Sequence, residues 1–513
     1  MSLSAIVETS QGRVEGVDRG GLFCFMGLPY AKPPTGRLRF QPPEAAEPWS
    51  GVRPAVRNGP VSVQAALPFL RFLNAGAARQ SEDCLYLNVW TPGLDTERRP
   101  VLVWIHGGAF LVGSGSTAIY NGEPLAARND LVVVTLNYRL GALGFIHLDH
   151  VCGPGFEQSS NLGLRDQLAA LAWVRENIES FGGDPENVTV CGQSAGAMSI
   201  GALLGVDSEK RPFKRAILQS GAAQHVMSRS RADRVGEAFL AALGQPARTQ
   251  EDLSKIPMGQ ILQAQGRINR ELMGSSEMMV MLPCVDGDLI PEQPIHRVES
   301  GRLKDVDLLV GTTLDEWKLF APFDVRLPSF GNDSLVERFS EQLPVYSPHA
   351  PIAKVAARQF REAVRERGGR VTPFEVWSAY QSARIFHHPA AELANAQAQA
   401  GGRVYRYLFS WRPPALGPFV GAFHAIDVPF VFGLLSRPPL RFLPGLMRPA
   451  KRLSDRMQEA WGEFARTGDP GHSRLPSWHS YEGRNRSSMV FDRECTMMDR
   501  PLDSELDLID AWR

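Results

Sequence analysis

The chain has 513 residues, of which 43% are hydrophobic and 21% are charged, a composition typical of a soluble globular protein. Lysine and arginine together number 55, as do aspartate and glutamate, so the formal net charge is zero. This balance argues against nucleic acid or an anionic membrane surface as the main partner. No apolar run approaches the roughly 18 residues that a membrane-spanning helix needs.

The first sixteen residues include Glu8, Arg13 and Glu15 and lack the apolar run of an export signal. The six cysteines are sparse, and none forms a C-x-x-C pair or a metal-ligand spacing. His147 and His150 have no third ligand at a matching spacing. We therefore expect a cytoplasmic protein with reduced thiols, without a metal or another cofactor.

Strand and helix patterns alternate along the N-terminal half of the chain. Residues 6–16, centred on Ser10-Gln11-Gly12, predict an antiparallel hairpin. Apolar residues at spacings of three and four from Leu164 to Phe181 predict a helix that starts near Asn161 and stops at Gly182-Gly183. Largely apolar runs predict the central strands of a mostly parallel sheet, at residues 101–105, 131–136, 188–191, 216–218 and 306–310.

Strands that alternate with helices indicate an α/β architecture, a large central sheet flanked by helices. Long α/β enzymes can decorate one sheet with insertions, so we expect residues 1–513 to form a single catalytic domain. Two segments, 60–80 and 436–450, mix apolar residues with arginine and proline. They are either lids that line a substrate gorge or ordinary packed loops, and packed loops are the commoner case.

The sharpest motif is Gly192-Gln193-Ser194-Ala195-Gly196, directly after the expected strand 188–191 and before a helix-like stretch. A strand, a tight turn with serine at its apex and a helix together make a nucleophile elbow, which holds the serine Oγ clear of the backbone. The pentapeptide alone occurs by chance. Its position between a strand and a helix favours a catalytic serine at Ser194.

A second glycine motif, His106-Gly107-Gly108-Ala109-Phe110, follows the expected strand 101–105. Small residues at the end of a strand allow backbone N–H groups to point into a cavity. There they can stabilise the oxyanion of a tetrahedral intermediate, together with the N–H of Ala195. A purely structural turn is the alternative, and the elbow further along the chain argues against it.

A serine hydroxyl needs a base, and the base needs an orienting carboxylate. In this fold the chain order is serine, acid, histidine. Among the eight histidines after Ser194, His424 follows a strand at 403–411 and is the best candidate, whereas His387-His388 reads as incidental. Asp315 and Glu316 follow strand 306–310, and spacing alone does not choose between them.

Several long motifs together resemble the type-B carboxylesterases, which include bacterial para-nitrobenzyl esterases, animal carboxylesterases and cholinesterases. The stretches that carry the resemblance are residues 181–196, around the serine, and residues 82–92. Shorter matches lie at residues 27–31, 37–40, 137–139 and 430–433. The similarity extends from about Val7 to about Trp461 and implies the α/β-hydrolase fold, with insertions that form a lid or gorge.

The resemblance also implies roles for individual residues. Glu316 rather than Asp315 would be the acid, and the amides of Gly108, Ala109 and Ala195 would form the oxyanion hole. Two structural ion pairs are implied, Arg39 with Glu82 and Arg139 with Asp166. The expected reaction is two-step hydrolysis of small to medium carboxylic esters by monomers or weak homo-oligomers. A lipase or an amidase could use the same triad, and a non-catalytic adhesion protein is the rival from another class.

The chain departs from the family pattern in three places. Residues 58–83 contain no cysteine, so Cys84 lacks the upstream partner that extracellular members have. The residue before the nucleophile, often glutamate in the family, is Gln193. No tryptophan lies between Trp49 and Trp90, where cholinesterases hold choline by a cation–π contact. Uncharged esters are therefore the expected substrates.

Overall fold

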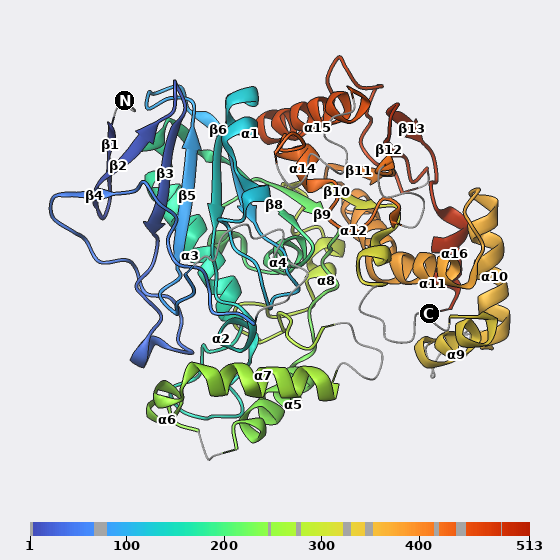
Figure 1. Ribbon diagram of the computed structural model, residues 1–513, viewed down its shortest axis with the longest axis horizontal. Coiled ribbons are helices and arrows are strands. Elements are labelled where there is room, and N and C mark those ends of the chain that lie inside the picture. The colour runs from blue at the N-terminus through green and yellow to red at the C-terminus, as the bar shows by residue number, and fades with distance from the viewer. Residues whose placement is uncertain are drawn as a thin grey trace.

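The computed structural model describes residues 4–65, 79–244, 248–272, 279–321, 330–343, 352–414, 420–437, 448–483 and 485–512. These residues build one mixed β-sheet with helices on both of its faces (Figure 1). Its central strands run parallel to one another in the order β7-β6-β8-β9-β10-β11-β12. They are β7 (Val132–Leu136), β6 (Arg99–Ile105), β8 (Gly183–Gln193), β9 (Arg215–Gln219), β10 (Asp307–Thr313), β11 (Val404–Phe409) and β12 (Ser488–Phe491).

Antiparallel strands extend the sheet at both ends. The predicted hairpin is confirmed, with Val7 opposite Val14 and Thr9 opposite Gly12 across the turn. One further strand, β13, is antiparallel to β12 at the other end of the sheet. The added strands are β1 (Ser4–Thr9), β2 (Gly12–Asp18), β3 (Phe23–Pro29), β5 (Tyr86–Thr91) and β13 (Thr496–Met498), while the short β4 (Val52–Pro54) pairs with β2.

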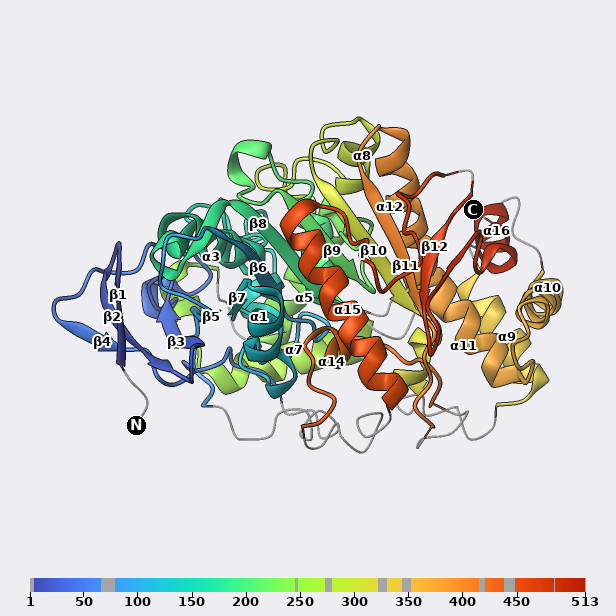
Figure 2. The same cartoon turned by 90° about the horizontal axis from the view of Figure 1, so that it is seen from above.

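The central strands are buried on both faces, which explains why their sequences read as continuous apolar runs. Alternate side chains enter two different cores: Val101, Val103 and Ile105 join one cluster, whereas Leu102 and Trp104 join the other. Helices cover each core (Figure 2). One face carries α1 (Glu123–Asn129), α14 (Val428–Val431) and α15 (Arg448–Thr467), and the other carries α2 (Gly141–Phe145), α3 (Leu162–Asn177), α4 (Ala195–Leu203), α5 (Arg229–Ala242), α7 (Met258–Leu272), α8 (Pro294–Glu299) and α12 (His388–Gln399).

A third cluster of aromatic side chains, including Phe339, Phe360 and Trp377, lies beyond the β12 end of the sheet (Figure 1). It joins helices that follow β10 in the chain with the last helix. These helices are α9 (Asn332–Gln342), α10 (Ala353–Glu366), α11 (Pro373–Ser382) and α16 (Asp503–Ala511). A further helix, α6 (Gln250–Lys255), lies between α5 and α7 in the chain.

The predicted helix after residue 160 is confirmed as α3, followed by a 3-10 turn at Ile178–Phe181 that ends at Gly182. Asn161 stands at its start but does not cap it with its side chain. The Asn161 amide instead donates to the carbonyl oxygen of Cys284 and to Asp286 Oδ2, at 2.9 and 2.7 Å. Long-range contacts therefore take the place of the local cap.

Both implied ion pairs are present. Arg139 Nη2 lies 2.6 Å from Asp166 Oδ1, and both side chains are almost completely buried. Arg39 Nε lies 2.7 Å from Glu82 Oε2, and the Arg39 guanidinium also donates to backbone carbonyls at the end of α6. Loss of one partner from a buried ion pair would leave an uncompensated charge and destabilise the fold.

The two possible lid segments, 60–80 and 436–450, lie mostly outside the described residues, which omit 66–78 and 438–447. The described ends of the first, residues 61 and 80, pair with each other in an isolated bridge. The last residues of the second, 448–450, form the start of α15. Within the described ranges, no helix combines the length and the apolar character needed to cross a membrane.

Candidate active site

Ser194 occupies the turn between β8 and α4, in the arrangement of strand, tight turn and helix that the sequence predicts. Its backbone has φ 57° and ψ −128°, a conformation that residues with a side chain rarely adopt. Gly196 follows closely, and a Cβ there would lie 2.0 Å from the carbonyl oxygen of Ile105. The turn therefore needs glycine at 196 so that α4 can approach β6.

His424 and Glu316 meet beside this turn. His424 lies in the segment after β11, and Glu316 begins a short 3-10 turn after β10 (Glu316–Leu319). His424 Nδ1 is 2.5 Å from Glu316 Oε2, and Glu316 Oε1 accepts the N–H of Thr313 at 2.7 Å. Burial alone would raise the pKa of Glu316, but the adjacent His424 holds it below its ordinary value. Glu316 is therefore ionised and fixes the imidazole with its proton on Nδ1.

Gln193, the residue before the serine, contacts the other nitrogen of the same imidazole. Its side-chain amide nitrogen lies 3.0 Å from His424 Nε2, and both side chains are buried. Because Nδ1 carries the proton, Nε2 accepts this bond and Gln193 donates it. Ser194 is half-buried, and its Oγ forms no hydrogen bond with another residue that the structure describes. Sequence reasoning placed Gln193 beside the serine but missed this contact.

The second glycine motif lies directly against the elbow, because β6 and β8 are neighbours with Ile105 opposite Gly192. Gly108 and Ala109 have positive φ values of 121° and 54°, which turn the chain sharply after β6. Among the described residues, none accepts a hydrogen bond from the backbone N–H of Gly108, Ala109 or Ala195. Three unpaired amides thus occur on the two segments that flank Ser194.

Asp315 contacts the histidine loop rather than the histidine. Its Oδ2 accepts the N–H of Ala422 at 2.9 Å, and its own N–H donates to the Ala422 carbonyl oxygen at 2.9 Å. Burial would raise the pKa of Asp315, but Lys318 and Arg412 lower it below its ordinary value. Asp315 therefore anchors the backbone two residues before His424, and of the two acids it is Glu316 that touches the imidazole.

Two aromatic rings enclose the imidazole. The ring centres of Phe320 and Phe386 lie 5.1 and 4.9 Å from that of His424. Both come from segments next to the acid or packed on it, and Phe320 stands four residues after Glu316. They shield the contact between His424 and Glu316 from water, which strengthens it. Sequence reasoning missed both, although the position of Phe320 after the acid was visible.

A buried network supports the elbow from the opposite face of the sheet. The N–H of Ser194 donates to the Gln219 carbonyl oxygen at 2.9 Å, and the Gln219 side chain donates to Asp427 Oδ2 at 2.9 Å. The Tyr407 hydroxyl donates to the same oxygen, also at 2.9 Å. Asp427 is completely buried, and burial raises its pKa to about 6. Nothing in the sequence marked Asp427, three residues after His424, as a buried acid.

The other histidines considered in the sequence have separate surroundings. His147 is buried and its Nε2 contacts the Leu282 carbonyl oxygen, whereas His150 is exposed beside Arg229. His387 is buried and bonded to the Thr312 hydroxyl at 2.8 Å, and burial lowers its pKa to about 4. In the described part of the chain, no three metal-ligating side chains gather at one point.

Comparison with known proteins agrees with this geometry. The model of the carboxylesterase family matches residues 3–508. The chain is 37% identical to the para-nitrobenzyl esterase of Bacillus subtilis over 499 residues, which cover 97% of this chain and 96% of that protein. It is 34% identical to an acetylcholinesterase of Bungarus fasciatus, over 90% of this chain and 78% of the relative.

The fold is also similar to a solved structure of the Geobacillus stearothermophilus carboxylesterase EST55, with a TM-score of 0.86 and 36% identity. That match covers 99% of this chain and 100% of the other. The predicted α/β-hydrolase fold is thereby confirmed. With a family model that matches nearly the whole chain and a bacterial esterase that aligns along 96% of its length, this protein belongs to the carboxylesterase family and is a serine hydrolase of carboxylic esters.

Proposed function

We propose that Ser194 is the nucleophile, His424 the base and Glu316 the orienting acid of this esterase. The observation that carries the assignment is the 2.5 Å contact between His424 Nδ1 and Glu316 Oε2. It leaves Nε2 as the acceptor for the serine proton. Ser194 Oγ then attacks the ester carbonyl, and His424 returns the proton to the leaving alcohol. Water, activated by the same nitrogen, hydrolyses the acyl-enzyme.

The backbone amides of Gly108, Ala109 and Ala195 would stabilise the tetrahedral intermediates. Negative charge appears on the carbonyl oxygen only as the intermediate forms, so donors that are already in place stabilise the transition state more than the substrate. The absence of a described acceptor for these amides supports the role. Removal of one such donor typically lowers kcat by about 10²- to 10³-fold.

Gln193 competes with Ser194 for the lone pair of His424 Nε2 in the first step. In the resting site its amide holds the lone pair of His424 Nε2, 3.0 Å away. Proton transfer requires that this lone pair face Ser194 instead, so substrate binding exchanges one hydrogen bond for another. Gln193 also stands directly before Ser194 in the chain, and because it is neutral it offers no charge to a cationic substrate.

Uncharged small to medium esters are the substrates that these features favour. The chain aligns with an acetylcholinesterase, but it has neither a carboxylate before Ser194 nor a tryptophan between Trp49 and Trp90. The assay is a panel of nitrophenyl esters of increasing acyl length, triglycerides and anilides. Preference for short nitrophenyl esters supports an esterase, preference for triglycerides a lipase and preference for anilides an amidase. Absence of all three activities would favour the adhesion-type alternative.

The whole chain would work as one catalytic unit, since the family model extends over residues 3–508. A cytoplasmic location is supported by six free thiols, because oxidising compartments favour disulfides. We expect monomers or weak homo-oligomers. Light scattering of the eluted peak in size-exclusion chromatography measures the mass, and limited proteolysis tests for a separable domain.

A further inference from the structure

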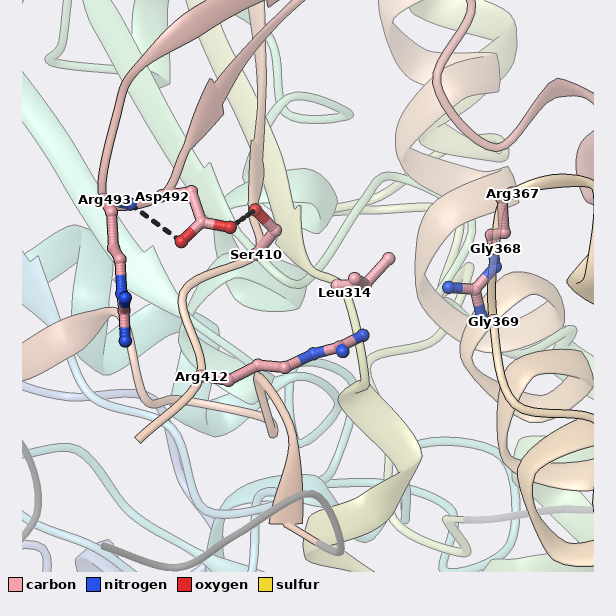
Figure 3. A pocket seen from close by; sticks show the side chains of 8 residues that line it. All are labelled: Leu314, Arg367, Gly368, Gly369, Ser410, Arg412, Asp492 and Arg493. Carbon is pink, nitrogen blue, oxygen red and sulfur yellow. Dashed lines mark hydrogen bonds between the residues drawn. The ribbon is translucent and has the colours of Figure 1, made fainter. Parts of the chain in front are cut away.

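A cavity of about 340 Å³ lies at the carboxyl ends of β10, β11 and β12 (Figure 3). Leu314 follows β10, Arg412 follows β11 and Arg493 follows β12, and Arg367 enters from the opposite side at the end of α10. In open α/β sheets, ligands bind outside the carboxyl ends of the strands. Neither Ser194 nor His424 lines this cavity, so it is a site apart from the ester-binding site.

Its lining carries three guanidinium groups and one carboxylate, Asp492. The carboxylate is already engaged, because Asp492 Oδ2 accepts the Ser410 hydroxyl at 3.0 Å and Oδ1 accepts the N–H of Arg493 at 2.7 Å. The excess of positive charge on the wall attracts anions. The cavity also has a rim of glycine backbone at Gly368 and Gly369, which leaves room beside the arginines.

The three arginines keep donors available. Arg367 uses its Nε for Glu505 Oε1 at 2.6 Å, and Arg412 Nε is 3.5 Å from Asp315 Oδ2. Each of these contacts leaves further N–H groups of the same guanidinium unused. Arg493 forms no ion pair with any residue in the described ranges, and its side chain extends along the cavity wall (Figure 3).

We propose that this cavity binds a small oxyanion, a carboxylate or a phosphate. The planar fork of an arginine matches two oxygens of such an anion and binds them more strongly than it binds a spherical ion. The volume is suited to a small organic acid. The acid released by ester hydrolysis and inorganic phosphate are the two sources of this chemistry.

The experiment measures binding without turnover. Protein whose active serine is blocked with phenylmethylsulfonyl fluoride is titrated calorimetrically with acetate, benzoate or inorganic phosphate, and with chloride at equal ionic strength. We expect Arg412→Gln and Arg493→Gln each to weaken oxyanion binding about tenfold, the value of one charge-assisted hydrogen bond. Asp492→Asn removes a repulsive charge and should tighten binding several-fold. Arg175→Gln, on the exposed surface of α3, is the matched control and should change nothing.

Misfolding would weaken oxyanion binding, so the tighter binding expected for Asp492→Asn cannot result from an unstable variant. Binding of benzoate and acetate alone identifies the reaction product as the source, and binding of phosphate alone identifies the inorganic ion. The proposal fails if chloride binds equally well, if the arginine variants keep full affinity, or if blocking Ser194 abolishes binding. None of these results bears on the triad, because no ester is turned over.

Discussion

Gln193 Nε2 and His424 Nε2 are 3.0 Å apart in the resting site, so the nitrogen that we propose accepts the serine proton is already hydrogen-bonded to a neighbouring amide. The two residues are 231 positions apart in the chain. The contact holds the imidazole in place before substrate arrives. It also makes the chemical nature of residue 193 a determinant of how easily His424 gains a proton.

Replacement of Gln193 by glutamate tests this relationship. A carboxylate 3.0 Å from Nε2 cannot donate to it and favours the protonated imidazole, so the acidic limb of the profile of kcat/KM against pH should move to higher pH. The same charge should raise kcat/KM for a choline ester relative to its uncharged isostere several-fold, about 1 kcal/mol. Gln193→Met, which is neutral, should show neither effect. A wild-type enzyme that already prefers the choline ester strongly would refute the selectivity argument.

Loss of the proposed nucleophile or base should abolish most activity. Ser194→Ala and His424→Ala should each lower kcat for a nitrophenyl ester by about 10⁴- to 10⁶-fold, because the triad acts as a unit. The exposed His479 is the control, and His479→Ala should retain full activity. Thermal unfolding of each variant verifies that the fold is intact. Activity of either triad variant within about tenfold of wild type would exclude its assignment.

The two adjacent acids should differ in what they do. Glu316→Gln should lower kcat by about 10³- to 10⁴-fold, since a neutral amide does not stabilise the imidazolium. Asp315→Asn weakens the hydrogen bond that anchors Ala422, and a hydrogen bond to a charged group contributes about 1.5 to 3 kcal/mol. We therefore expect this variant to lower kcat by only about 10- to 100-fold. Steady-state kinetics on one ester compares them. If Asp315→Asn is the more damaged variant, the acid is not Glu316.

Asp427 should make stability depend on pH. Its pKa is about 6 in the folded protein against an ordinary value of 3.8, because burial disfavours the charged form. The folded state therefore holds the proton more tightly than the unfolded state. The stability contributed by this group is complete below about pH 4 and is lost as pH rises through 6, by about 3 kcal/mol at most.

Urea unfolding of wild type and Asp427→Asn at several values between pH 4 and pH 8 isolates this contribution. The asparagine oxygen can still accept from Gln219 and Tyr407, and its charge does not change. The difference in the free energy of unfolding should grow in favour of the variant as pH rises. Parallel curves for the two proteins would show that Asp427 does not titrate in this range.

The number of free thiols tests whether the protein resides in a reducing or an oxidising cellular compartment. All six cysteines are free, and burial raises the pKa of Cys84 to about 12. Denatured protein without reductant should therefore react with six equivalents of Ellman's reagent. Strong reductant should leave the melting temperature unchanged, since it has no bond to break. A lower thiol count would point to a disulfide and to an oxidising compartment.

The parts of the molecule that depend on local pattern could be predicted from the sequence. Strands β6 and β7 are buried on both faces and read as apolar runs, and the turn at Ser194 requires small residues within five positions. The choice between Asp315 and Glu316 could not be made from spacing, because the turn after β10 decides which carboxylate faces the imidazole of His424. The family resemblance supplied that choice.

Features assembled from distant segments could not be predicted. The contact between Gln193 and His424 depends on the packing of the segment after β11 against the elbow. The arginine-lined cavity depends on the order of β10, β11 and β12 in the sheet, which places Arg412 and Arg493 on one wall. The burial of Asp427 depends on Tyr407 and Gln219, from two other strands. In each case local sequence gives no signal, because the partner residues come from other elements.

The positive φ of Ser194 places catalysis and folding in opposition at one residue. A side chain in that backbone region destabilises the native state by about 1 to 3 kcal/mol, and only the rest of the sheet holds it there. Selection for thermostability alone would favour glycine at this position, with loss of the proposed nucleophile. Retention of the serine is thus a trade-off, in which the hydrolase keeps a less stable turn in return for a correctly aimed hydroxyl.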